Sequence, residues 1–179
     1  TKSRAITAIV LVLVGISLYI AFAFRKVSHP VSSWKYGFIT LITLFHDAVI
    51  PAGLFALLGY FLHIEIDVNF IVAILLVVGF SVHDTIVVFD RIRENLRKTG
   101  GKEPFEQVVN EAVLQTLARS LTTSLTVLFT LLALVLFGGE SIRWFVVALL
   151  IGIFSGTYSS IFNAAPLLVL WEERRNPRK

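Results

Sequence analysis

The chain has 179 residues, of which 56% are hydrophobic and 16% charged, and its mean hydropathy is +0.81. A soluble domain of this size is rarely so apolar, so the composition argues against a globular enzyme and indicates an integral membrane protein. With no cysteine, the sequence excludes a disulfide framework and a thiolate metal site. The net charge of +4 becomes informative only once the charges are placed along the chain.

Five apolar segments are each long enough to cross a hydrocarbon core about 30 Å thick, which needs about 20 helical residues. The first follows Lys2 and Arg4 as a signal peptide would, but no small-residue cleavage site follows its apolar core, so it is predicted to be a true span. The sequence therefore predicts an all-α, polytopic membrane helix bundle, with residues 1–179 as one transmembrane domain. Its spans are expected at residues 5–24, 36–61, 68–89, 120–137 and 144–171.

The distribution of Lys and Arg predicts the orientation. Thirteen of the sixteen basic residues lie between the first two spans, between the third and fourth, or at the C-terminus. By the positive-inside rule these segments face the cytoplasm, so the N-terminus is expected outside and the C-terminus inside. Because the chain also begins with Thr1 rather than Met, it is expected to be a fragment that an earlier span precedes.

Residues 91–118 are expected to form a cytoplasmic helical loop. Glu94 precedes Arg97 and Lys98 by three and four residues, which favours helix, and Gly100-Gly101 would end it. From Phe105 to Leu117, apolar residues recur at helical spacing with Glu and Asn on the other side. This pattern predicts an amphipathic helix at the cytoplasmic interface or against another helix.

Ionisable residues inside the predicted spans need an explanation. A charge at the centre of a membrane helix costs about 2.5–3.5 kcal/mol, and such residues usually face a bundle interior or a wet cavity. Asp84 lies in the third span, and His46 and Asp47 lie near the middle of the second. Each carboxylate could carry protons or could only lock helix packing. His83, about 100° round the helix from Asp84, is expected to point elsewhere.

The last two spans each carry a one-sided polar stripe. Small and hydroxylated side chains allow close helix packing, but they could equally line a hydrated path for protons. Arg119 could take part in such a path or only extend to the interface. The stripes comprise Arg119, Thr123, Thr126 and Thr130, and Ser155, Ser159 and Asn163.

No enzyme signature is present. The sequence has no glycine-rich phosphate loop, HExxH, Cys/His cluster or GxSxG, so neither catalysis nor a bound cofactor or metal is predicted. Nucleic-acid binding is not indicated either. The chemistry that remains is proton binding and ion pairing, with protons as the coupling ion.

Four stretches resemble the SecF family of protein-export membrane proteins, in order along the chain. They are FHDAVIPAG (45–53), SVHDTIVVFDRIREN (81–95), QTLARSLTTSLTVL (115–128) and GTYSSIFNAAPLLVLWE (156–172). The resemblance implies half of a pseudo-symmetric bundle of the resistance-nodulation-division (RND) type. It also implies that this chain corresponds to the second to sixth spans, without the first span and an extracytoplasmic domain.

The resemblance further implies a function in the bacterial cytoplasmic (inner) membrane. Such proteins work with SecD, use the proton gradient, and help draw exported unfolded polypeptide through and out of the SecYEG channel, with YidC and YajC as further partners. Carried over, Asp84 is expected to take up and release protons, and Arg119 to interact with that relay. Family members often have Asn where this chain has His83.

Two alternatives remain open. One is an RND-type half-transporter that exports small molecules or lipids. The other is a structural membrane subunit, in contact with lipid, in which Asp84 and Arg119 form only an assembly lock.

Overall fold

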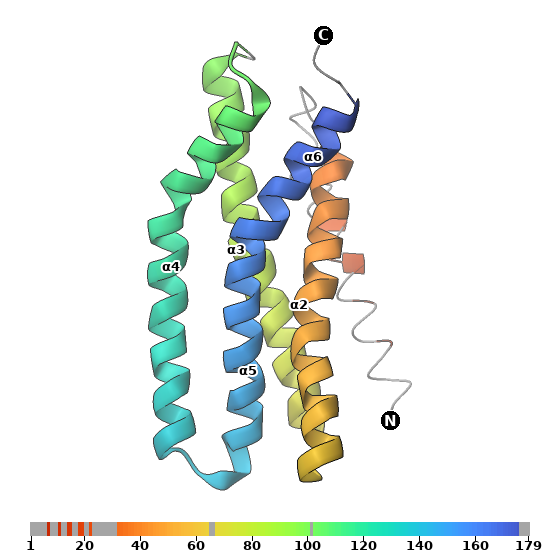
Figure 1. The fold of residues 1–179 in the computed structure, drawn as a ribbon, viewed down its shortest axis with the longest axis vertical. Coiled ribbons are helices and arrows are strands. Elements are labelled where there is room, and N and C mark those ends of the chain that lie inside the picture. The colour runs from red at the N-terminus through yellow and green to blue at the C-terminus, as the bar shows by residue number, and fades with distance from the viewer. Residues whose placement is uncertain are drawn as a thin grey trace.

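The computed structural model describes residues 32–64, 67–100 and 102–175, together with seven isolated positions between residues 7 and 22. The described chain forms a long up-and-down helix bundle (Figure 1). Four of its helices are long and apolar enough to cross a membrane. The helices are α2 (Ser33–Leu62), α3 (Val68–Thr99), α4 (Phe105–Phe137), α5 (Glu140–Ser159), the π-helix η1 (Ser160–Ala164) and α6 (Ala165–Arg175).

The expected spans at 36–61, 68–89, 120–137 and 144–171 lie within these four helices, in a protein that crosses the membrane several times. The fifth expected span, at 5–24, falls outside the described residues apart from the isolated positions. In the last span, α5, η1 and α6 follow one another without a break, so together they make one crossing element.

The expected amphipathic helix is the first part of a longer helix, α4. Val108, Val109 and Ala112 are buried and Glu106 and Glu111 are exposed, so that part of the chain is amphipathic as expected. It nevertheless belongs to the same continuous helix as the following span, because no Gly or Pro interrupts residues 105–137. Residues 91–118 are thus the extended ends of α3 and α4, joined by a short connection.

The end of α3 follows its local sequence. Gly100 adopts a left-handed conformation with a φ of 58°, as a glycine after a helix commonly does, so the predicted helix end is confirmed. Glu94 pairs with Lys98 at 2.7 Å and with Arg91 at 2.6 Å. Arg91 also donates from Nε to the side-chain oxygen of Gln115 at 2.6 Å, which ties the end of α3 to α4.

The helix α3 packs against α2, α4 and α5, and two glycines of α5 lie close against α3. A Cβ added at Gly152 would lie 2.2 Å from Cγ2 of Val77, and one added at Gly156 would lie 3.1 Å from Cβ of Ser81. Only the missing side chains let these helices meet, so the two glycines fix the register of α5 against α3.

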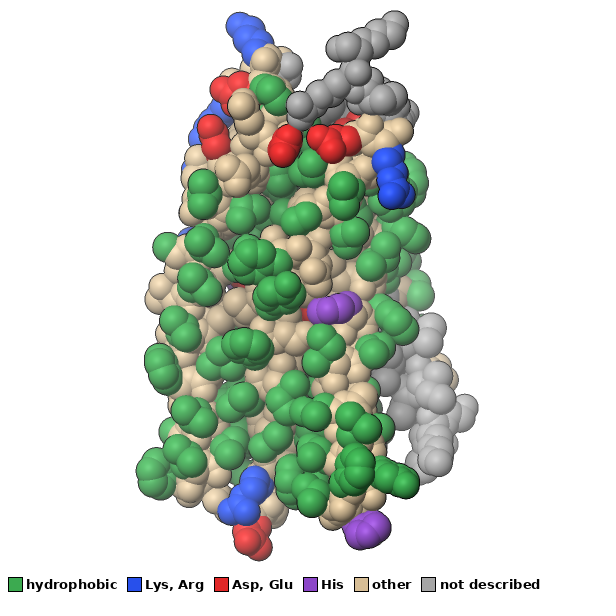
Figure 2. Space-filling view, viewed as in Figure 1, with side chains coloured by type: hydrophobic (Ala, Val, Ile, Leu, Met, Phe, Trp, Pro, Cys, Tyr) green, Lys and Arg blue, Asp and Glu red, His purple; other side chains and the backbone are tan. Residues whose placement is uncertain are grey.

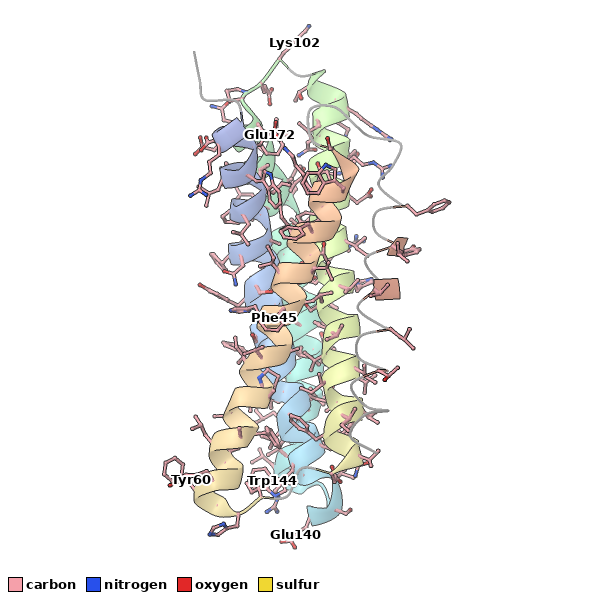
Figure 3. All side chains as sticks on the ribbon, turned by 90° about the vertical axis from the view of Figure 1, so that its right-hand side faces the viewer. Phe45, Tyr60, Lys102, Glu140, Trp144 and Glu172 are labelled. Carbon is pink, nitrogen blue, oxygen red and sulfur yellow. The ribbon has the colours of Figure 1, made fainter. Side chains whose placement is uncertain are left out.

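Proline accounts for the irregular part of the last span. Pro166 lacks the N–H that would bond the carbonyl of Phe162, and its ring would clash with that carbonyl in a regular α-helix. The five residues of η1 lie just ahead and widen the helix, which is one way to accommodate such a proline. Further along the chain, α6 is held to the start of α2 by a buried ion pair between Lys35 and Glu172 at 2.6 Å, near the upper end of the bundle in Figure 3.

The outer surface suits a hydrocarbon environment. Large apolar side chains are exposed along α2 and α4, among them Phe45, Leu57, Phe129 and Leu136. The face seen in Figure 2 is covered by hydrophobic side chains over most of its length, with charged side chains gathered towards its two ends. Burial inside the bundle and exposure to lipid together explain why the chain is apolar on nearly every side.

Candidate functional site

Two aspartates are buried in the bundle, one on each of two neighbouring helices. Asp47 of α2 has no exposed surface, and Asp84 of α3 is 6% exposed. Phe45, two residues before Asp47, lies about midway along the bundle (Figure 3). A carboxylate at this depth is costly unless hydrogen bonds replace its contacts with water. Both aspartates have such bonds.

Asp84 accepts a hydrogen bond on each of its carboxylate oxygens. Ser120 of α4 donates from Oγ to Oδ1 at 2.8 Å, and Ser160, the first residue of η1, donates to Oδ2 at 2.8 Å. The carboxylate therefore joins three segments that are far apart in sequence.

Asp84 also borders a cavity of about 280 Å³. Arg119 and Thr123 of α4 line the same cavity, and so does His83, although it was expected to point elsewhere. Among the described residues no ion pair joins Arg119 to Asp84, so cation and carboxylate share a space without direct contact. The structure thus brings together four residues that the sequence singled out, and it leaves Asp84 both buried and accessible.

Asp47 has a denser set of partners. Ser81 of α3 donates to its Oδ2, and Ser159 of α5 donates to the same oxygen at 2.7 Å. Nδ1 of His46 lies 2.9 Å from Oδ1. The imidazole of His46 therefore folds back onto the side chain of the next residue.

His46 connects the Asp47 site to a second cavity, of about 340 Å³, between α2 and the η1–α6 segment. The side chain of His46 is 40% exposed, and Asn163 and Thr43 lie in the same wall. Pro51 follows Asp47 by four residues and offers no N–H to the Asp47 carbonyl, which loosens the helix at this point.

The remaining predicted residues divide between the site and the surface. Ser155 is buried one turn before Ser159, and its hydroxyl has no hydrogen-bond partner among the described residues. Thr126 is exposed and donates to the carbonyl of Thr122 at 2.8 Å, so the structure places it away from both aspartates. The stripe on α4 thus reaches the cavity only through Arg119 and Thr123.

Sequence reasoning missed Ser81, Ser120 and Ser160. A serine in a membrane helix is easily taken for a packing residue, and the stripe chosen on α4 lies one position round from its buried serines. The structure shows what was overlooked, because Ser81 and Ser120 fall on the faces that α3 and α4 bury.

The arrangement can bind and release protons at oxygen and imidazole nitrogen. Within the described ranges, no cluster of three His, Asp or Glu side chains is placed to hold a metal ion. The distinctive feature is that two adjacent residues donate hydrogen bonds to different carboxylates, Ser159 to Asp47 and Ser160 to Asp84.

Comparison with known proteins agrees with this picture. A protein-family model described as "Protein export membrane protein SecD/SecF, C-terminal" matches residues 1–174. The chain belongs to the SecD/SecF family. Relatives named protein translocase subunit SecF include that of Thermobaculum terrenum, 60% identical over 97% of this chain and 53% of that protein. Another is that of Anaerolinea thermophila, 44% identical over 94% of this chain and 54% of that protein.

Longer SecD/SecF relatives match as well. The protein translocase subunit SecDF of Thermus thermophilus is 41% identical over 96% of this chain and 22% of its own length. A crystal structure of SecDF in its super-membrane-facing form superposes with a TM-score of 0.86 and 40% identity, over 98% of this chain and 22% of that one. The chain spans about half the length of the SecF relatives named above.

Proposed function

We propose that this SecD/SecF family chain is the membrane part of a SecF-like subunit that uses the proton gradient to promote translocation of exported polypeptides through the Sec channel and their release from it. In this proposal Asp84 takes up and releases the coupling proton, and Arg119 is its relay partner. One observation carries it: Asp84 is buried and hydrogen-bonded, yet it borders a cavity that Arg119 also lines.

The physical basis is a balance at Asp84 between opposing effects. Burial disfavours the ionised carboxylate, whereas the two serine hydroxyls and the nearby guanidinium favour it. A small movement of α4 relative to α3 would change the distance between Arg119 and Asp84, and so decide whether the proton is held. A proton that crosses 100 mV releases about 2.3 kcal/mol, which is enough to bias one helix packing over another.

Other polar residues extend this path. His83 lies in the wall of the Asp84 cavity, and His46 joins Asp47 to the second cavity. We include all three in the proton-handling machinery, with Thr123, Ser155, Ser159 and Asn163 as its polar walls.

The proposed partners are SecD and the SecYEG channel, in a bacterial inner membrane. The SecDF relatives support SecD, because their name joins both subunits in one chain. The extracytoplasmic domain that would contact exported polypeptide, and the first span, are proposed to lie in the rest of the full protein.

A structural subunit is the second candidate, and the hydrogen bonds between helices favour it. Ser120 and Ser160 attach α4 and η1 to α3 through Asp84, so the carboxylate could serve packing alone. An exporter of small molecules or lipids has no comparable support in the site.

Replacing Asp84 with asparagine tests the proposal in the full-length protein with its SecD partner. Asparagine keeps the size and one acceptor oxygen but cannot exchange a proton. We expect assembly with SecD to be unchanged and proton-gradient-dependent export to fall to the level measured without a gradient. The matched control is Asp90→Asn on the same helix, whose carboxylate is 65% exposed and which should export normally.

Normal export by the Asp84→Asn protein would contradict the proposal. If assembly is lost, the double variant Asp84→Leu with Arg119→Leu decides between the candidates. Recovery of both assembly and export in that variant would establish a packing role, because a proton carrier cannot work without its acid.

A further inference from the structure

The hydroxyl of Ser160 has two acceptors within reach. Its Oγ lies 2.8 Å from Oδ2 of Asp84 and 3.0 Å from the backbone carbonyl oxygen of Thr157. A serine hydroxyl carries a single proton and two lone pairs, so it can donate fully to only one of these oxygens while it accepts a bond from another group. Ser160 can therefore turn between a donor and an acceptor role towards Asp84.

The other serine at Asp84 has no such choice. In the described part of the chain, the hydroxyl of Ser120 has only Oδ1 of Asp84 as an acceptor. Oδ1 thus keeps a fixed donor, while Oδ2 faces a donor that can turn away. The two oxygens of one carboxylate are chemically distinct.

We propose that the coupling proton of Asp84 is held on Oδ2 and that Ser160 accepts the hydrogen bond from it. This inference rests on the proposed function of Asp84 as the proton carrier. When the proton arrives, an O–H bond forms at Oδ2, and the Ser160 hydroxyl rotates to donate to the Thr157 carbonyl. Oγ of Ser160 then accepts from the new Asp84 O–H. Release reverses these steps.

This arrangement keeps the buried groups hydrogen-bonded in both protonation states. Ionised Asp84 accepts from Ser120 and Ser160; protonated Asp84 accepts from Ser120 and donates to Ser160. No heavy atom has to move, so neither state leaves an unsatisfied polar group in the apolar interior. The exchange lies at the start of η1, and π-helical segments frequently mark functional sites.

Asp47 is built differently. Its Oδ2 accepts from both Ser81 and Ser159, and neither hydroxyl has a second acceptor among the described residues. Protonation at Oδ2 would force a donor away without an alternative partner. A proton on Asp47 would therefore lie on Oδ1, beside Nδ1 of His46, and not on the oxygen that accepts from the two serines.

The ionisable residues around Asp84 come from α2, α3 and α4. Arg119 of α4 and His83 of α3 line its cavity, and His46 and Asp47 of α2 are linked to it through the adjacent residues Ser159 and Ser160. The η1 segment contributes no ionisable side chain. Variants at Ser160 therefore change hydrogen bonding at Asp84 without changing charge.

Infrared spectroscopy of the full-length protein with its SecD partner tests the assignment. The carbonyl stretch of protonated Asp84 is identified as the band that appears on acidification and is missing in Asp84→Asn. A carboxyl group that donates a hydrogen bond absorbs at lower wavenumber than one that does not. We expect Ser160→Ala to move this band to higher wavenumber and Ser160→Thr, which keeps a hydroxyl, to restore it.

The matched control lies on α4, outside the proposed machinery. Thr126→Ala removes an exposed hydroxyl that donates to the carbonyl of Thr122, away from both aspartates, and should not move the Asp84 band. An Asp84 band that is unchanged in an assembled Ser160→Ala complex would overturn the role of Ser160 and leave the proposed function standing. Absence of any Asp84-dependent band at every pH that the complex tolerates would overturn both.

Discussion

The oxygens of Asp47 and Asp84 accept hydrogen bonds from four serine hydroxyls, on α3, α4, α5 and η1. No arginine or lysine forms an ion pair with either aspartate within the described ranges. Neutral donors stabilise a buried carboxylate less firmly than a bound cation does, so protonation remains possible. At the scale of single residues, serine donors in place of a salt bridge are what the proposed role of Asp84 requires.

Asp47→Ala tests whether this second aspartate holds the bundle together. The substitution removes the acceptor of Ser81 and Ser159, which stay buried, and we expect it to destabilise the folded state by about 1–3 kcal/mol. Adding Ser81→Ala and Ser159→Ala should recover part of the loss, because the orphaned hydroxyls disappear. Thermal unfolding of the purified complex in detergent measures both effects. An unchanged melting temperature together with lost export would instead assign Asp47 a role in proton transfer.

The sequence was sufficient to find the acids but not their partners. An aspartate in a membrane span is conspicuous, and Arg119 stands out as a charge on a polar stripe. Asp84, His83 and Arg119 line one cavity, although His83 was expected to point elsewhere. Ser160 lies 76 positions from Asp84, and Ser159 lies 112 from Asp47. Helical spacing within one span says nothing about the register between spans, so these bonds could not be predicted.

At the scale of helices, the register between α3 and α5 determines which serine meets which aspartate. The contacts of Gly152 with Val77 and of Gly156 with Ser81 set the height at which Ser159 and Ser160 reach the two carboxylates. Both glycines lie where α5 meets α3 with less room than a side chain normally has. Their packing also positions the polar site, so the two alternatives for this stripe are not exclusive.

Gly152→Ala should disturb that register. The new methyl group would overlap both methyl groups of Val77, and valine cannot easily turn away because its branched Cβ restricts rotation. We expect a loss of stability of about 1–3 kcal/mol, as for other overpacked cores, measured as a lower melting temperature. Combining Gly152→Ala with Val77→Ala makes room and should restore most of it.

Gly79→Ala is the matched control for that experiment. Gly79 also lies in a membrane helix, on α3, but a Cβ there meets no atom within 4 Å. It should leave the melting temperature unchanged or slightly raise it, since alanine favours helix over glycine. Equal losses in the Gly79→Ala and Gly152→Ala proteins would refute the steric account and point to glycine-dependent helix flexibility.

At the scale of the whole molecule, hydropathy predicted four of the crossings because each is set by local composition. The joined helix α4 was mispredicted because a change from amphipathic to uniformly apolar sequence looks like a boundary, whereas backbone hydrogen bonding continues through it. The labelled residues of the connections and helix ends divide between the two ends of the bundle. Lys102 and Glu172 lie at one end, and Tyr60, Glu140 and Trp144 lie at the other (Figure 3).

The orientation of the bundle in the membrane can be measured because this chain contains no cysteine. Arg97, Lys98 and Lys102 lie at or just beyond the end of α3, whereas the turn between α4 and α5 carries Glu140 and Arg143. The excess of basic residues predicts that the α3–α4 connection faces the cytoplasm.

In right-side-out vesicles, a membrane-impermeant maleimide should label Ser141→Cys and leave Lys102→Cys unlabelled until the vesicles are opened. Inverted vesicles should give the opposite pattern, with vesicles that contain the unsubstituted protein as the blank. Labelling of Lys102→Cys in sealed right-side-out vesicles would contradict the predicted orientation.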